Sequence, residues 1–346
     1  MFKKLLSTII AVSLILNAFF ITYAGANLAN DSLSFVQQGN KYIYSNNPEQ
    51  LLYSHLLGGI GAYTISQSLT SNTNYSAEFS HINYTSNNLT IGVMICNVNS
   101  TAQTVRVYNN KYATSGPFSN YTSIGASVET NYWNASAGYT DYSIPANKTL
   151  FICSTVVSHG NIATGKVLFK PLANNMYAKV VFVKQGSEAS AISVGGITGD
   201  GAPQTTATYN TDTRSTTYNY STAINKRFYL SLVSPTSPAV SNSNESESPL
   251  YYLPNTNPTL MGNYGINYFI TFQNATGKTL RITPDWASVH LNGYTSQDYS
   301  IFNGSTWQTI HFNDNSYYDY VVPSSQVIKF ILPGGNTGNV QFKFIN

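Results

Sequence analysis

The chain has 346 residues, of which only 9% are charged, whereas 42% are hydrophobic and 14% are aromatic. So few charges exclude a coiled coil, and the apolar and aromatic content excludes intrinsic disorder. The formal net charge of +3 leaves no basic stripe, so we expect no nucleic-acid partner. Asparagine occurs 39 times and tyrosine 27 times, which indicates a folded chain with a largely uncharged polar surface.

The first residues are typical of a secretory signal. Two lysines at positions 3 and 4 precede an apolar stretch, which ends in the small residues Ala24, Gly25 and Ala26. We expect a signal peptide over residues 1–26 and cleavage after Ala26 or Ala24. The mature protein would then be secreted, extracellular or attached to the cell surface, with no membrane contact. An uncleaved anchor is the alternative, because the stretch approaches the roughly 20 residues that span a bilayer.

Alternating apolar and polar residues predict strands along the mature chain. Residues 89–96, 268–272 and 340–344 show this period of two and are rich in β-branched and aromatic side chains. The best helical candidate is a single turn at 48–52, where a proline occupies the first position. The pattern therefore predicts an all-β chain.

Three short segments of the first half recur in the same order in the second half. The matching pairs are 99–107 with 274–282, 144–149 with 322–327, and 164–170 with 337–343. Chance similarity between two sequences of biased composition is the alternative explanation. Repetition at this long period predicts duplicated globular domains rather than a solenoid of short repeats.

The repeat and the strand spacing together predict the domain organisation. We expect two tandem immunoglobulin-like antiparallel β-sandwich domains related by internal duplication. The expected boundaries are 27–184 for the first domain and 185–346 for the second. A stretch rich in Ser, Pro and Asn at 234–248 is expected to be a long loop within the second domain.

Cys96 and Cys153 are the two cysteines of the chain. An even number of cysteines in an exported protein suggests a disulfide, which would contribute about 4 kcal/mol in the chain-entropy model. Two buried free thiols are the alternative, because cysteine is common in protein cores.

Reactive groups in the sequence do not form a recognisable catalytic or metal-binding set. The five histidines lack metal-binding spacing, and His81 is expected to be a hydrogen-bonded strand residue. Asp285 and Asp298 are a weak candidate for a carboxylate pair. Residues 313–315 with Asp319 are a weak candidate for a calcium site, with a solvated loop as the preferred interpretation. We therefore expect no enzyme, no cofactor and no metal.

Aromatic residues in or beside predicted loops are the remaining candidates for binding. Their rings could stack on sugars, although rings that cap the core are the alternative for each of them. The candidates are Tyr132, Trp133, Tyr251, Tyr252, Trp286 and Trp307.

Several short motifs carry a resemblance to a known group of proteins. They include 42–49 (Tyr-Ile-Tyr, then Asn-Pro-Glu), His81 with Asn83, 89–97, and 262–268. In these motifs the chain resembles uncharacterised exported bacterial two-domain β-sandwich proteins. Some members carry a copper amine oxidase-like stalk domain, which has no counterpart here. The resemblance implies an exported β-sandwich protein and supplies no catalytic residue.

The expected function follows from the signal, the duplicated β domain and the low charge. We expect a non-catalytic secreted protein of the cell surface or extracellular matrix that acts by adhesion or self-association. Cell-envelope polysaccharide and copies of the chain itself are the expected partners. A carbohydrate-binding module that uses the loop aromatics is the alternative, and an extracellular hydrolase with a non-local active site is a third, less favoured hypothesis.

Overall fold

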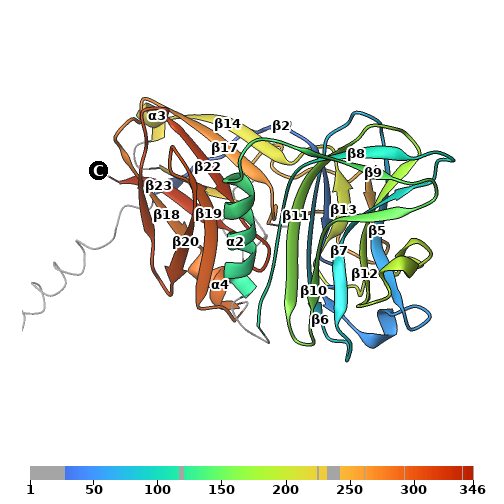
Figure 1. The fold of residues 1–346 in the computed structure, drawn as a ribbon. Coiled ribbons are helices and arrows are strands. Elements are labelled where there is room, and N and C mark those ends of the chain that lie inside the picture. Colours follow the sequence, from blue (N-terminus) through green and yellow to red (C-terminus); the bar gives the residue numbers. More distant parts are fainter. Residues whose placement is uncertain are drawn as a thin grey trace, which may run out of the picture.

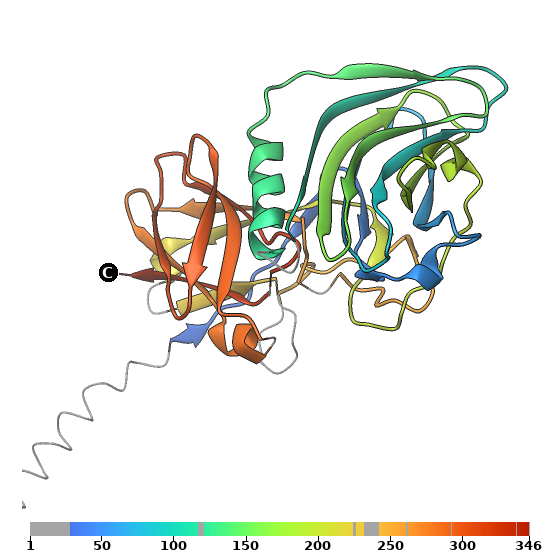
Figure 2. The same ribbon diagram turned by 60° about the horizontal axis from the view of Figure 1, so that its bottom comes forward.

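The structure, a computed structural model, describes residues 28–116, 121–223, 226–231, 242–260, 262–291, 293–336 and 338–345. The signal peptide expected at 1–26 lies outside the described residues. The chain is nearly all β, as its alternating pattern predicts, and its strands form four sheets. Two sandwich-like units lie side by side, each built from two of these sheets (Figures 1 and 2).

The first unit combines an eight-stranded and a four-stranded sheet. The larger sheet has the order β16-β13-β3-β6-β11-β8-β9, with β4 also paired to β6. Its strands are β3 (Lys41–Ser45), β4 (Gln50–Leu51), β6 (Tyr75–Asn83), β8 (Gln103–Thr114), β9 (Thr140–Ile144), β11 (Ile162–Pro171), β13 (Thr206–Tyr209) and β16 (Tyr251–Tyr252). The smaller sheet has the order β10-β7-β12-β5. Its strands are β5 (Gly61–Leu69), β7 (Leu89–Asn97), β10 (Thr149–Val157) and β12 (Met176–Lys184).

The second unit combines a six-stranded and a five-stranded sheet, ordered β2-β14-β17-β22-β19-β20 and β1-β15-β23-β18-β21. The strands of the six-stranded sheet are β2 (Val36–Gln38), β14 (Thr213–Asn219), β17 (Asn267–Gln273), β19 (Ser296–Phe302), β20 (Trp307–Asn313) and β22 (Val327–Ile331). Those of the five-stranded sheet are β1 (Ala29–Asn30), β15 (Lys226–Leu230), β18 (Thr279–Pro284), β21 (Tyr318–Val321) and β23 (Val340–Ile345). Aromatic rings fill the core, where Phe342 stacks on Phe228 and meets Phe330 edge to face.

Strand pairing crosses the boundary expected between residues 184 and 185. The N-terminal strands β1 and β2 pair with β15 and β14 of the second unit, whereas β13 and β16 join the eight-stranded sheet of the first unit. The stretch 234–248 is described only from residue 242 onward. There Ser243 bridges to Ser34, and Glu245 is buried. The two units therefore share strands along the chain instead of folding as consecutive segments.

Not all of the pairing is antiparallel. β3 pairs parallel to β6, and β14 pairs parallel to β17. Parallel neighbours require a long crossover connection, and alternation within a strand carries no information about such a connection. The antiparallel arrangement expected from the sequence thus holds for most described pairs, but not for these two or for the short parallel pairs β1–β15 and β4–β6.

The main helix is one that the periodicity did not reveal. Within the described residues, the helices are α2 (Tyr121–Trp133), α3 (Tyr220–Ala223) and α4 (Trp286–Leu291), and the 3₁₀ turns are η1 (Tyr53–His55) and η2 (Glu188–Ile192). The helical turn predicted at 48–52 is wrong, because residues 50–51 form strand β4. Helix α2 stands between the two units (Figure 1). None of the described helices combines the length and apolar character that a membrane crossing requires.

Cys96 and Cys153 are both buried and both free, so the expected disulfide is not formed in this structure. Strand β7 is buried on both faces, and the two thiols lie on opposite sides of its sheet. Cys153 belongs to the core between the sheets, whereas Cys96 packs with Met94 and Ala191 on the outer face beneath η2. Opposite faces cannot provide the short distance between Cβ atoms that a disulfide needs.

The recurrent segments occupy matching places in the two units. In the first unit, Arg106 on β8 lies opposite Asp141 on β9 and Lys170 on β11. In the second unit, Arg281 on β18 lies opposite Asp319 on β21 and Lys343 on β23. Each unit thus contains a three-stranded ladder with the same register, and β9 and β21 are the terminal strands of their sheets.

Candidate functional site

Helix α2 follows strand β8 of the first unit and packs on β19 and β20 of the second. Its Thr122 hydroxyl donates to the Asp298 carboxylate at 2.7 Å, and the Ser300 hydroxyl donates to the carbonyl of Ala126 at 3.1 Å. Just after the helix, the Asn134 amide pairs with the backbone N–H and C=O of Trp307 at 2.8 and 2.7 Å. These contacts fasten the two units to each other through one helix.

A buried charge cluster connects α2 to the eight-stranded sheet of the first unit. The Lys166 ammonium on β11 contacts the carboxylates of Glu129 on α2 at 2.7 Å and of Glu78 on β6 at 3.4 Å. It also donates to the carbonyl of Gly265 at 2.9 Å. The Tyr42 hydroxyl donates to Glu78 at 2.9 Å. All three charged side chains are about 1–2% exposed, so the cluster is sealed from solvent.

Burial and mutual charge shift the pKa values of the residues in this cluster. Desolvation raises the pKa of Glu129, and the nearby negative charge of Glu78 raises it further, although Lys166 opposes both effects. Burial by itself would lower the pKa of Lys166, but the two carboxylates raise it above its usual value. The cluster therefore holds one cation between two acids, and its burial raises the pKa of Glu129. Because it is enclosed, this group of residues positions α2 and does not meet a substrate.

The structure brings three of the six candidate aromatics together. Trp133 stacks on Trp307 with ring centroids 5.6 Å apart, and Tyr132 meets Trp133 edge to face at 5.2 Å. The Trp133 indole N–H donates to Glu129 at 3.1 Å. Tyr132 and Trp307 are buried, so these rings belong to the contact between the units and present no open sugar platform.

The other three candidate aromatics lie apart from that group. Trp286, at the start of α4, is half-buried and donates its indole N–H to the carbonyl of Ser316. Tyr251 and Tyr252 form β16 at one edge of the eight-stranded sheet, and both are exposed. Among the six, only this tyrosine pair is open to a partner.

The opposite edge of the eight-stranded sheet is also exposed. On β9, the residues 140–143 are all exposed, and the Arg106 guanidinium holds Asp141 through two hydrogen bonds of 2.8 Å. The ring of Tyr139 covers that guanidinium at 3.7 Å. Such an arginine is neutralised on one side and capped by an aromatic ring on the other.

The same arrangement recurs on β21 of the second unit. Arg281 holds Asp319 through two hydrogen bonds of 2.8 Å, and the ring of Tyr317 covers the guanidinium at 3.4 Å. Tyr139 and Tyr317 are 57% and 53% exposed, so both capped pairs lie on the surface. The recurrent segments 99–107 and 274–282 align the two arginines with each other. They do not predict that each arginine would contact an aspartate and a tyrosine.

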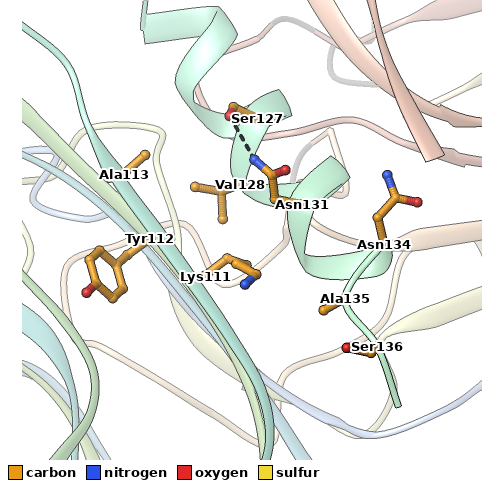
Figure 3. Close-up of a pocket in the computed structure, with 9 residues that line it drawn as sticks. All are labelled: Lys111, Tyr112, Ala113, Ser127, Val128, Asn131, Asn134, Ala135 and Ser136. Atoms are coloured by element: carbon orange, nitrogen blue, oxygen red, sulfur yellow. Dashed lines mark hydrogen bonds between the residues drawn. The ribbon is translucent and has the colours of Figure 1, made fainter. Parts of the chain in front are cut away.

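A surface cleft of about 370 Å³ lies between β8 and α2 (Figure 3). It is lined by Lys111, Tyr112, Ala113, Ser127, Val128, Asn131, Asn134, Ala135 and Ser136. Figure 3 shows Lys111 between the strand and the helix, whereas Tyr112 points away on the far side of the strand. Sequence reasoning did not single out this cleft, because its walls come from a helix that the pattern did not predict.

His81 is fully buried and hydrogen-bonded, as the sequence predicts. Its Nδ1 lies 2.8 Å from the carbonyl of Pro48, and its Nε2 lies 2.9 Å from the Ser45 hydroxyl. Burial lowers the pKa of His81 to about 4. The Ser–His contact is enclosed, because Ser45 and His81 are both 0% exposed, so no substrate can reach it.

The carboxylates considered as a catalytic pair have separate partners. Asp285 accepts a hydrogen bond from Asn339, whereas Asp298 is bound by Thr122 and lies 2.9 Å from His311. The pKa of His311 is raised by its hydrogen bond to Asp298.

The acidic oxygens considered for calcium are likewise engaged. Asp314 pairs with His290 at 2.6 Å, and Asp319 pairs with Arg281. Within the described ranges, no three His, Cys, Asp or Glu side chains are grouped so that they could hold a metal ion.

Comparison with known proteins gives no relative from which a role could be carried over. No protein-family model matches the chain, and no curated protein matches it significantly.

Proposed function

We propose that this chain is a non-catalytic exported β-sandwich protein that acts at the cell surface or in the extracellular matrix by adhesion or self-association. The observation that carries the proposal is the pair of exposed edge strands, β9 and β21, which end sheets in the two units. An edge strand presents unpaired backbone groups, to which a strand of another copy can add.

The side chains on these edges favour association. On each edge, the aspartate is neutralised by its cross-strand arginine, and an exposed tyrosine covers that arginine. Neither edge therefore carries the uncompensated charge by which many proteins keep their edges apart. Tyrosine adds a large contact area at low cost in side-chain entropy.

We further infer that the two units arose by duplication of one β-sandwich. The matching registers of β9-β8-β11 and β21-β18-β23 support this inference, as do the three recurrent segments of the sequence. A duplicated edge gives one molecule two equivalent attachment strands. Contacts between different edges of successive copies would then extend into a chain of molecules instead of closing a dimer.

Self-association can be tested by placing lysines on both edges. The double variant Ser143→Lys and Val321→Lys adds charge to β9 and β21, where Val321 is 62% exposed. The matched control, Ala102→Lys with Ala287→Lys, adds the same charge at exposed positions outside the edge strands.

Sedimentation velocity over a wide concentration range should show assemblies for the mature protein and for the control, and monomer for the edge variant. A mature protein that stays monomeric at every concentration and does not bind its own cell envelope would overturn the proposal.

A carbohydrate-binding module remains the second candidate, because Tyr251 and Tyr252 are open at the other edge of the same sheet. Exposed rings of this kind can stack on sugars. Glycan-array binding that disappears in the Tyr251→Ala, Tyr252→Ala double variant, but persists in Tyr53→Ala, would favour this function. Binding to no glycan would eliminate it.

A further inference from the structure

The cleft between β8 and α2 has the chemistry of a small polar binding site. Its volume of about 370 Å³ is near the lower end of the range of ligand pockets, which suits one or two sugar units. Ser127, Asn131 and Ser136 line it with hydroxyl and amide groups, and Ser127 and Asn131 are already joined by a hydrogen bond of 3.2 Å. The Asn134 side chain is not counted among the groups that could bind a ligand, since it is hydrogen-bonded to the backbone of Trp307.

Lys111 is the charged residue of this lining. It projects from β8 on the same side as Ala113, toward the helix (Figure 3). Lys166, its neighbour across the ladder, is paired with two carboxylates, but no described carboxylate lies within ion-pair distance of Lys111. Lys111 is a half-buried residue and has no acidic partner in the described chain, which favours an anionic ligand.

The rest of the wall fits a ligand rich in hydroxyl groups. Its hydrogen-bonding groups are the hydroxyls of Ser127 and Ser136 and the amide of Asn131, which can pair with sugar hydroxyls. Val128, Ala113 and Ala135 supply a small apolar surface for C–H groups. A bare inorganic anion would contact Lys111 but would not use these hydroxyl and amide groups or this apolar surface.

We propose that this cleft binds a carboxylated saccharide of the uronic acid type. The Lys111 ammonium contacts the carboxylate, and Ser127 and Asn131 bind the ring hydroxyls. An acidic polysaccharide would thereby attach to the first unit at a surface separate from the edge strands. This inference does not depend on self-association through β9 and β21.

Titration of the mature protein with glucuronate- and galacturonate-containing disaccharides, followed by NMR chemical shifts, tests the proposal. Neutral glucose and galactose disaccharides serve as comparison ligands. We expect the acidic sugars to bind at least tenfold more tightly than the neutral ones, since a hydrogen bond to a charged group is stronger than one between neutral groups. Binding should weaken as salt is added.

The variant Lys111→Met should weaken uronate binding tenfold or more, and Asn131→Ala should weaken it less. The matched control Lys148→Met removes an exposed lysine outside the cleft and should bind as the parent does. Thermal unfolding of each variant verifies that the fold is retained. The proposal is overturned if uronates do not bind, if neutral sugars bind equally well, or if Lys111→Met binds like the parent. None of these results bears on the edge-strand variants, so the two proposals can fail separately.

Discussion

The ammonium group of Lys166 on β11 lies 2.7 Å from the carboxylate of Glu129 on α2, and both side chains are about 1% exposed. This contact joins the eight-stranded sheet to the helix that also docks on the second unit. Through Trp133, which donates to Glu129 and stacks on Trp307, the ion pair is linked to strand β20. The position of α2 therefore depends on a charge cluster as well as on apolar packing.

Replacing Lys166 with methionine should be strongly destabilising. The substitution leaves Glu129 and Glu78 buried without their cation, and breaking a buried pair in this way typically costs about 3–5 kcal/mol. Urea unfolding, followed by tryptophan fluorescence, measures the loss. The triple variant Lys166→Met, Glu129→Gln, Glu78→Gln should recover much of it, because no unpaired charge then remains. Equal losses in the single and triple variants would show that charge is not the cause.

Stability should fall as the pH rises through the range in which Glu129 titrates. The pKa of Glu129 is raised to about 8 in the folded protein, mainly by burial, so the folded state holds a proton that the unfolded state releases at lower pH. The unfolding free energy should therefore decrease between about pH 4.5 and pH 8.

The Glu129→Gln variant isolates this effect. His81 acts with the opposite sign below about pH 6.5, because its folded pKa is lowered to about 4. The clean comparison is thus between pH 6.5 and pH 8, where the parent should lose stability and Glu129→Gln should lose much less. Identical pH profiles would contradict the assignment.

Gly125→Ala should weaken the docking of α2 even though alanine is the better helix former. A Cβ at this position would lie 2.3 Å from the carbonyl oxygen of Gly334, which belongs to the second unit. Overpacking of this kind costs about 1–3 kcal/mol, more than the roughly 1 kcal/mol gained in helix propensity. Denaturant unfolding measures the change, and Ser127→Ala on the exposed side of α2 is the matched control. A Gly125→Ala variant more stable than the parent would mean that the helix does not approach so closely.

Cys96 and Cys153 should react with an alkylating reagent only after unfolding. Both thiols are buried, and burial raises the pKa of Cys153 to about 12, which suppresses its thiolate. Intact mass should show no modification of the native protein, and two modifications in denaturant without reductant. Labelling that requires a reductant would reveal a disulfide.

Arg106→Met and Arg281→Met should have similar, small effects on stability. Both arginines are paired with an aspartate and capped by a tyrosine on the surface, where solvent screening leaves such ion pairs little effect on stability. Thermal unfolding of the two variants, with Lys148→Met as a surface control, provides the comparison. If only one of the two variants lost much stability, the two arginines would contribute differently to stability in spite of their similar geometry.

The alternating sequence determined the strands and the approximate repeat. Val340 and Phe342 are buried along β23 as the period of two predicts, and the recurrent segments of both halves lie in ladders of the same register. The free state of Cys96 and Cys153 could not be predicted. Strand β7 is buried on both faces, so the alternation of its side chains does not show which of them lie between the two sheets and which lie on the outer face.

Tertiary structure alone decided the features around α2. The buried face of this helix is made largely of Thr122, Gly125, Ala126 and Val128, small residues that leave little helical hydrophobic pattern. Lys166, Glu78 and Glu129 are charged residues far apart in the sequence. Their burial is tolerated because they pair with one another, which offsets the cost of removing them from water. Local sequence sets the period of a strand through alternating side chains, whereas the partners of a buried charge and the closeness of two backbones are set when distant segments pack.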